Sequence, residues 1–501
     1  MSWLTVRKTG AVAVCGAILV AASPVFSASA DAANPYATQA ASAAKWQAGE
    51  LVDGGIPGFS GSDWGLTIDT VMALAATRSE PAALKAATDA VAANIRKYNS
   101  AEEWGMPGSR IAGATAKVLF ASVVAGRDPA AFGGLDMRAE TLDLVAGADA
   151  GDDVGRVRDK LTGSPDSGNA FGQSLAVLGL ARSGGVPQSA VDFLIKQQCP
   201  SGGFRLFPGQ LGSTGPVCQD TPTTVLDPDS TGMAVQALLS AAAESGSTGA
   251  AAAAKKGADW LKSRQQADGS FGGSGPTAAS NTNSTGLAGQ ALYAAGYSTE
   301  ADKAAAWVAK HQITTDNAGA ATKDVGTIAY NEEALTSARA EGIPDFQRDQ
   351  WRRATPQALL VLAGVPLGNL GKAPTEPTGT ATSTPAPTRS DTPAPTGSAT
   401  HTESASPSTS ATPTTSLTQT ASASISASSS ASATNTNQAG TGGSVSGGGS
   451  TSGGGGTANG GGGSLARTGA EIGGLVLLAV GLVGTGFAVR AGARRKNGQH
   501  T

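Results

Sequence analysis

The chain is poor in side chains on which several classes of protein depend. Its 501 residues include 3 cysteines and 3 histidines, too few for the clustered ligands of a zinc protein. Lysine and arginine total 35 against 38 acidic residues, a net charge of −3, which gives nucleic acid no electrostatic attraction. We therefore expect no nucleic-acid partner, no bound metal and no cofactor.

Catalytic signatures are also missing. The sequence has no G-x-S-x-G elbow, no P-loop, no H-E-x-x-H and no calcium loop. Aromatic residues are 5% of the chain, few for a cavity that stabilises carbocations by cation–π contact. These absences disfavour the enzyme classes that such motifs identify.

Residues 1–30 have the features of a signal peptide. Arg7 and Lys8 precede an apolar stretch at 11–22, and the small residues of Ala28–Ala30 form a cleavage site. The mature chain is therefore expected to begin near Asp31. The alternative is an N-terminal membrane anchor, which the shortness of the apolar stretch disfavours.

The other end combines three signals over residues 465–501. An uncharged apolar run at 472–489 has the length of a transmembrane helix, and a basic tail follows it. Immediately before it comes "LARTG", formed by Leu465, Ala466, Arg467, Thr468 and Gly469.

This order resembles the cell-wall sorting signal of Gram-positive surface proteins, in its LAxTG variant. The resemblance implies that a sortase cleaves after Thr468 and joins that residue to peptidoglycan. Sortase and peptidoglycan, or its precursor, are then the expected partners. The expected location is the outer face of the cell wall, with a membrane-spanning form before cleavage. The alternative is a plain single-pass membrane protein.

Residues 371–464 are expected to be a disordered linker. They are rich in Thr, Ser and Pro and then in Gly, and they have too little apolar surface to offset the entropy of ordering. Such a segment is typical of a stalk that carries the domain at 31–370.

Within that domain, Cys199 and Cys218 are the two cysteines left in an exported chain, which predicts a disulfide rather than two free thiols.

The domain contains an internal repeat. "FLIKQQCPSGGF" (193–204) aligns with "WLKSRQQADGSF" (260–271), and "DPDSTGMAVQAL" (227–238) aligns with "NTNSTGLAGQAL" (281–292). Amphipathic segments alternate with segments that are apolar nearly all round, which predicts outer and inner helices. The inner helices are expected near 65–76, 113–126, 171–184, 231–243, 285–296 and 326–338. Outer helices are expected near 37–51, 81–98, 135–146, 187–198, 251–264, 299–312 and 346–362.

These repeats resemble those of protein prenyltransferase β-subunits and squalene or terpenoid cyclases. The resemblance implies an all-α fold, an (α/α)6 toroid of alternating inner and outer helices. It does not by itself imply the reactions of those enzymes. Prenyltransferases hold zinc with Asp, Cys and His, and the domain has a single histidine, His311.

Asp227 and Asp229 stand at the start of a predicted inner helix. The cyclase resemblance implies that Asp229 is a proton donor, but Ser230 replaces the last acid of that motif. Aspartate is also a preferred N-cap, and the next repeat has Asn281 and Asn283 at the equivalent positions. Capping is therefore the favoured interpretation, and contact with a ligand is compatible with it.

Four other residues are candidates for ligand contact. Trp64 and Asp69 lie at one predicted inner-helix start, and Trp104 and Arg110 precede the next. Tryptophan beside a charged group suits a sugar, although such residues are more often packing anchors.

The sequence favours a surface protein whose toroid binds a small molecule, glycan or protein. The alternatives are an enzyme, glycan-cleaving or cyclase-like, that uses Asp227 and Asp229, and a structural spacer or adhesin.

Overall fold

The computed structural model describes residues 34–59, 61–161, 166–208 and 215–372. The predicted signal peptide lies outside these ranges. So do the sorting signal with its transmembrane segment and, apart from Gly371 and Lys372, the linker. No helix within the described ranges has the length and apolar character required to cross a bilayer.

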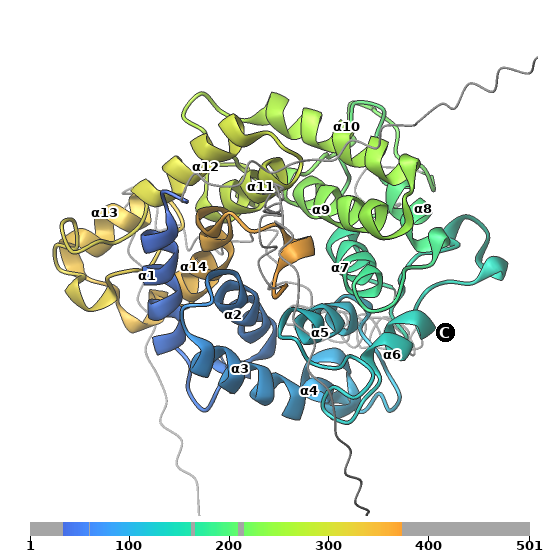
Figure 1. Cartoon of the computed structure of the whole chain (residues 1–501), viewed down its shortest axis with the longest axis horizontal. Coiled ribbons are helices and arrows are strands. Elements are labelled where there is room, and N and C mark those ends of the chain that lie inside the picture. The colour runs from blue at the N-terminus through green and yellow to red at the C-terminus, as the bar shows by residue number, and fades with distance from the viewer. Residues whose placement is uncertain (1–33, 60, 162–165, 209–214, 373–501) are drawn as a thin grey trace, which may run out of the picture. The chain divides into compact units, whose positions relative to one another are not determined.

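Six inner helices form a closed ring (Figure 1). Each packs on the next, and the last packs on the first. They are α2 (Trp64–Thr77), α5 (Ala112–Val124), α7 (Ala170–Ala181), α9 (Pro228–Ser245), α11 (Thr282–Ala294) and α14 (Arg348–Ala363). Nearly every residue of α2, α5, α7 and α11 is buried, which explains why these segments are apolar all round.

Outer helices alternate with the inner ones along the chain. They are α1 (Ala37–Gly49), α3 (Pro81–Ala93), α6 (Met137–Asp143), α8 (Gln188–Lys196), α10 (Thr248–Arg264) and α12 (Ser298–Lys310). One face of each is buried and the other is exposed. The described domain is thus an all-α toroid, as predicted, and has six outer helices where the sequence suggested seven.

Additional short elements occupy the loops between these helices. They are the helices α4 (Ile95–Asn99) and α13 (Glu332–Glu341), the strands β1 (Ile56–Pro57) and β2 (Ser62–Asp63), and six 3-10 turns, η1 (Glu102–Trp104), η2 (Ala148–Asp153), η3 (Gly275–Thr277), η4 (Thr322–Asp324), η5 (Asp345–Gln347) and η6 (Leu367–Asn369). The two strands pair antiparallel just before α2.

The last pair of helices corrects the sequence prediction. The segment 326–338 was expected to be inner, but it contains the start of α13, in which only Leu335 and Ala338 are buried. The segment 346–362 was expected to be outer, but it forms α14, which is buried from Ala354 to Leu362. The arginines in the first half of α14 made it look amphipathic, whereas they bind acidic residues of distant elements.

The inner helices are fixed at their N-termini by a repeated hydrogen bond. In three of them, a threonine in the first turn accepts from a backbone N–H of the preceding segment at 2.9 Å: Thr67 from Ile56, Thr231 from Phe204 and Thr285 from Phe271. Midway along α14, Thr355 accepts at 3.0 Å from the N–H of Ile328, which precedes α13. The first three bonds tie an incoming segment to the helix that follows it, and the fourth ties the segment before α13 to α14.

The opposite end of the ring is crossed by residues 364–372, which we name the closing segment (Figure 1). Gln236 and Gln290, from α9 and α11, bond its backbone at 2.8 and 2.6 Å. Leu367 and Leu370 are fully buried there. The closing segment therefore covers the C-terminal end of the inner helices and leaves the N-terminal end as the side open to loops.

The insertion in the first repeat carries the predicted disulfide. Cys199 and Cys218 are bonded across a sequence separation of 19 residues. A loop of this size gains about 3 kcal/mol of stability from the cross-link in the chain-entropy model.

Replacing Leu367 tests the closing segment. We expect Leu367→Ala to lower the free energy of unfolding by about 2–5 kcal/mol, because a fully buried leucine leaves a cavity. Urea denaturation measures the change. The control Val52→Ala, at a side chain that is 58% exposed, should stay within about 0.5 kcal/mol of the parent. Equal stabilities of the two variants would show that the segment does not pack against the ring.

Candidate functional site

The N-termini of the inner helices carry most of the predicted site residues. Four of these helices are capped by Asp or Asn side chains, which accept from a backbone N–H three residues on. The caps are Asp63, Asn169, Asp227 and Asn281. A fifth inner helix, α5, is capped by a residue from a distant loop: Asp159 accepts from Ala112 N–H at 2.7 Å.

Asp227 is confirmed as a cap. Its Oδ1 accepts from both the N–H and the hydroxyl of Ser230 at 2.7 Å. Its Oδ2 accepts from the Ser274 hydroxyl at 2.7 Å. Both oxygens are therefore engaged, and Asp227 holds the η3 loop against the start of α9. Asn281 does the equivalent work at α11, where it accepts from Ser284 N–H at 2.8 Å.

Asp229 is in a different situation. It is 1% exposed, and its Oδ1 has no hydrogen-bond partner among the described residues. Burial raises its pKa well above the ordinary value, the charge of Asp227 raises it further, and the Ser284 hydroxyl only partly offsets this. These surroundings favour the neutral carboxylic acid form of Asp229, the form that can donate a proton.

A buried ion pair lies on the other side of the ring. Lys117 Nζ on α5 is 2.7 Å from Asp69 Oδ1 on α2, and both side chains are at most 1% exposed. Lys117 also donates to the carbonyl oxygen of Gly65 at 2.9 Å. Burial raises the pKa of Asp69 and lowers that of Lys117, and each is partly offset by the other's charge.

Amide side chains connect the surroundings of Asp229 with the Asp69–Lys117 ion pair. Asn283 Nδ2 on α11 donates to Gln357 Oε1 on α14 at 2.6 Å, and Gln357 in turn acts on Asp69 and lowers its pKa. Contacts therefore run from α9 through α11, α14 and α2 to α5. We name this set of six residues the polar belt: Asp69, Lys117, Asp229, Asn283, Ser284 and Gln357.

Several atoms of the polar belt lack partners. Within the described ranges, Asp229 Oδ1, Asn283 Oδ1, Ser284 Oγ and Gln357 Nε2 are buried with no hydrogen bond of 3.5 Å or less, although Ser284 and Gln357 lie close enough to Asp229 and Asp69 to lower the pKa values of those carboxyl groups. An unsatisfied buried polar group costs about 1–3 kcal/mol, so four in one place are comparable with the stability of a whole domain. Such a concentration indicates a place where water or a ligand supplies the missing hydrogen bonds.

The charges of the belt cancel. Asp69 and Lys117 neutralise each other, and the burial of Asp229 keeps it protonated. Arg353, at the start of α14, is paired with Asp63 and Asp349, each at 2.7 Å. The arrangement therefore suits a polar ligand without net charge.

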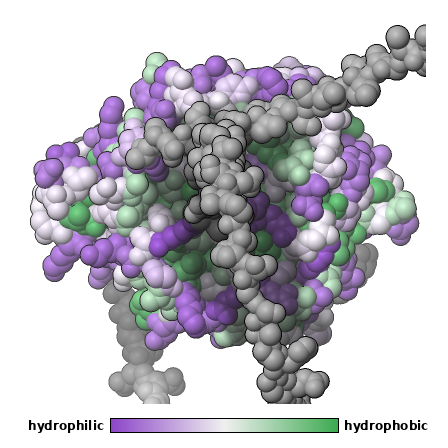
Figure 2. All heavy atoms as spheres, viewed as in Figure 1, coloured by the Kyte–Doolittle hydropathy of each residue, from purple (hydrophilic) through white to green (hydrophobic). Residues whose placement is uncertain are grey.

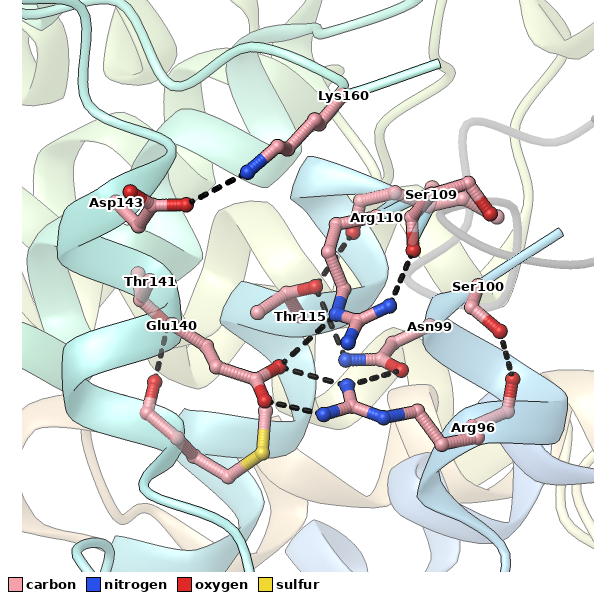
Figure 3. A network of polar contacts seen from close by, with 12 residues as sticks. Arg96, Asn99, Ser100, Ser109, Arg110, Thr115, Glu140, Thr141, Asp143 and Lys160 are labelled. Carbon is pink, nitrogen blue, oxygen red and sulfur yellow. Dashed lines mark hydrogen bonds and ion pairs between the residues drawn. The ribbon is translucent and has the colours of Figure 1, made fainter. Parts of the chain in front are cut away.

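Apart from Trp104, the remaining predicted site residues pack against the core or take part in ion pairs outside the polar belt. Trp64 is half-buried and packs against the core. Arg110 is paired with Glu102 at 2.8 Å and with Glu140 at 3.4 Å, and Figure 3 shows it within a wider network that includes Arg96 and Lys160. Trp104 lies beside this network and is 52% exposed.

The two hollows on the surface of the domain lie away from the polar belt. Two surface hollows, of about 320 and 470 Å³, are lined by residues such as Arg156 and Arg205, and Asp316 and Arg339. No group of three His, Cys, Asp or Glu side chains that could hold a metal occurs in the described part of the chain. The belt residues are at most 5% exposed, and none of them lines either hollow.

Sequence reasoning found Asp69, Asp229 and Asn283 but missed Lys117, Ser284 and Gln357. Lys117 carried a usable signal, because a lysine in the middle of the apolar segment "GATAKVLF" must be paired if that segment is buried. Gln357 carried no usable signal in the sequence, since its helix was assigned to the outer layer.

Among known proteins, this chain is similar only to solved structures, and the similarity lies in how the helices are arranged. No known family and no curated protein matches the chain. Among solved structures, it is similar to an unsaturated glucuronyl hydrolase specific for heparin, with 10% identity, 66% of this chain and 98% of that chain covered, and a TM-score of 0.45. It is also similar to the unsaturated glucuronyl hydrolase of Bacillus sp. GL1 (10%, 67% and 96%, 0.44) and to the α-1,6-mannanase GH76A of Salegentibacter sp. HEL1_6 (10%, 66% and 98%, 0.44). At such scores these similarities assign neither activity nor substrate, and the relation to prenyltransferases and cyclases stays a prediction.

The protonation of Asp229 can be read from stability. An aspartate in an unfolded chain loses its proton near pH 3.9, whereas folded Asp229 keeps its proton to a higher pH. Proton release therefore favours unfolding as the pH rises through this interval. Asp229→Asn cannot ionise in either state, so it should gain stability relative to the parent between pH 4 and pH 7, as measured by urea denaturation.

A suitable control is Asp136→Asn, at the N-cap of outer helix α6. Because Asn and Asp cap equally well, this variant should track the parent at both pH values. If Asp229→Asn instead lost stability between pH 4 and pH 7, Asp229 would be charged in the folded protein and the assignment would be wrong.

Proposed function

We propose that the protein binds a neutral, polyhydroxylated ligand of the glycan class at the N-terminal end of its ring. The observation that carries this proposal is the group of unpartnered donors and acceptors on α9, α11 and α14. Sugar hydroxyls both donate and accept hydrogen bonds, so they can satisfy an amide nitrogen and carboxyl or amide oxygens together. The cancelled charges favour a neutral sugar over a charged one.

A second candidate function is cleavage of that glycan with Asp229 as general acid. The raised pKa of Asp229 favours it, because glycoside hydrolysis begins with protonation of the leaving oxygen by a carboxylic acid whose pKa is elevated. Asp227 is not favoured in this role, since its Oδ1 caps α9 and its Oδ2 accepts from the Ser274 hydroxyl. Cyclisation of a polyprenyl chain is not favoured, because the polar belt would place amides and charges beside a carbocation.

We further propose that the domain is exported and attached to the cell wall. The signal peptide, the LARTG motif and the apolar run with its basic tail support this by their order in the chain. The expected partners are a sortase and peptidoglycan or its precursor. A glycan-binding domain on a stalk at the cell surface would meet polysaccharides of the wall or of the surroundings.

Glycan binding is tested by calorimetry with the full chain and neutral gluco-, manno- and chito-oligosaccharides. We expect Gln357→Met to weaken binding about tenfold, the equivalent of one lost hydrogen bond of about 1.4 kcal/mol. Gln188→Met, on the exposed face of α8, is the matched control and should bind as the parent does. Absence of binding to every oligosaccharide would refute the proposal.

The same samples separate binding from cleavage. If Asp229 is a general acid, release of reducing ends should fall by at least about 100-fold in Asp229→Asn, while binding persists. If the parent binds but releases no reducing ends, the protein is a binding module and the second candidate is rejected.

Attachment to the wall depends on Thr468. We expect Thr468→Ala to abolish covalent recovery of the protein with purified peptidoglycan, because the carboxyl group of Thr468 would form the new bond. Immunodetection after boiling the walls in detergent is the measurement, with Ser464→Ala just before the motif as the control. Persistence of Thr468→Ala in boiled walls would contradict the assignment.

A further inference from the structure

Exposed aromatic side chains gather at one end of the ring. Within the described residues, the large aromatics with high exposure are Phe59 (110%), Phe346 (83%), Trp104 (52%) and Tyr293 (39%). The first three stand in loops that lead into inner helices, whereas Tyr293 lies in the last turn of α11, toward the opposite end. Three of these four exposed aromatics thus share one kind of position in the fold.

The three loops precede inner helices that are neighbours in the ring. Phe59 is at the tip of the β1–β2 hairpin, which ends at the cap of α2. Trp104 closes the η1 turn before α5, and Phe346 is in η5, which runs directly into α14. The helices α14, α2 and α5 follow one another around the ring, so the three aromatics stand before three consecutive inner helices. We name these three residues the aromatic rim.

Each member of the rim is mounted on a braced loop. The hairpin of Phe59 is closed by a hydrogen bond from Gly58 N–H to the Gly61 carbonyl at 2.7 Å. The η1 turn of Trp104 is held by the ion pair of Glu102 with Arg110 at 2.8 Å.

The η5 turn of Phe346 is followed at once by Arg348. This arginine pairs with Glu50 and, at 3.0 Å, with Asp324. All three aromatics are therefore presented on fixed platforms, which lowers the entropy cost of binding.

We infer that Phe59, Trp104 and Phe346 are stacking platforms for successive sugar rings of an extended glycan chain. This rests on the proposed binding of a neutral glycan and specifies it: the ligand is an oligosaccharide or polysaccharide rather than a monosaccharide. The rim takes the apolar faces of the sugar rings, and the polar belt beneath takes the hydroxyls of the sugar that enters the ring. Aromatic side chains provide such flat apolar contact together with a directional π-face.

The surroundings of the rim favour a glycan over a protein or a membrane. Exposed carboxylates stand beside two of the aromatics in the sequence, Glu103 beside Trp104 and Asp345 beside Phe346, whereas the core of a protein interface is depleted of charge. On the face shown in Figure 2, hydrophobic residues occur as patches interrupted by hydrophilic ones. Acidic neighbours also oppose an anionic lipid surface.

Chain length separates the rim from the belt. Calorimetry with the full chain should compare disaccharides with hexasaccharides of whichever neutral series binds. We expect Phe59→Ala, Trp104→Ala and Phe346→Ala each to weaken hexasaccharide binding about threefold to tenfold and to leave disaccharide binding unchanged. Tyr293→Ala, an exposed aromatic away from the rim, is the matched control and should match the parent for both.

The outcomes are distinguishable. If hexasaccharide binding survives all three rim substitutions but is lost in Gln357→Met, the rim proposal is overturned and the belt proposal stands. If no oligosaccharide binds the parent, both are overturned. If the rim variants lose binding to phosphatidylglycerol vesicles and not to glycans, the rim is a membrane contact and the glycan assignment is wrong.

Discussion

The structure depends on how buried polar groups are satisfied where six inner helices begin. Each helix leaves free N–H groups at its N-terminus, and in a double-layered ring these ends are covered by neighbouring loops. The chain meets this constraint with Asp or Asn caps and with threonines that accept from the incoming loop, as Asp227 and Thr231 do at α9. These bonds join loops to helices. The hydrogen bonds that satisfy the helix ends therefore also hold the loops on the N-terminal face of the ring.

Against this background, the polar belt stands apart because its groups are not needed for capping. Asn283 and Gln357 bond to each other yet leave one atom each without a partner, and Asp229 is buried next to a carboxylate that already caps the helix. A buried pair such as Asp69 and Lys117 adds little stability over apolar side chains of the same size. A fold selected only for stability would have leucine at these positions, as Leu175 is in α7. Stability alone therefore does not explain the belt.

Local signals made much of the fold predictable. Five of the six inner helices follow from their all-round apolar pattern, and the disulfide follows from an even count of cysteines. The failure at α13 and α14 has one physical cause: Arg348, Arg352 and Arg353 bind Glu50 and Asp63, about 300 residues away in the chain. Helical periodicity cannot distinguish an arginine in solvent from one in such a pair, and the same limit hid Gln357. Where partners are local, as for the cap Asp227, the sequence sufficed.

The aligned repeats explain why one aspartate of the pair differs from the other. Asp227 and Asn281 both cap, so a charged or a neutral acceptor serves equally at that position. Two residues later, Asp229 and Asn283 both point away from capping and into the belt, where Asn283 donates to Gln357. A protonated aspartate is, like asparagine, a neutral side chain with both a donor and an acceptor. The two repeats thus present equivalent hydrogen-bonding groups at neighbouring places on the ring, and only the one at α9 also has a proton to give.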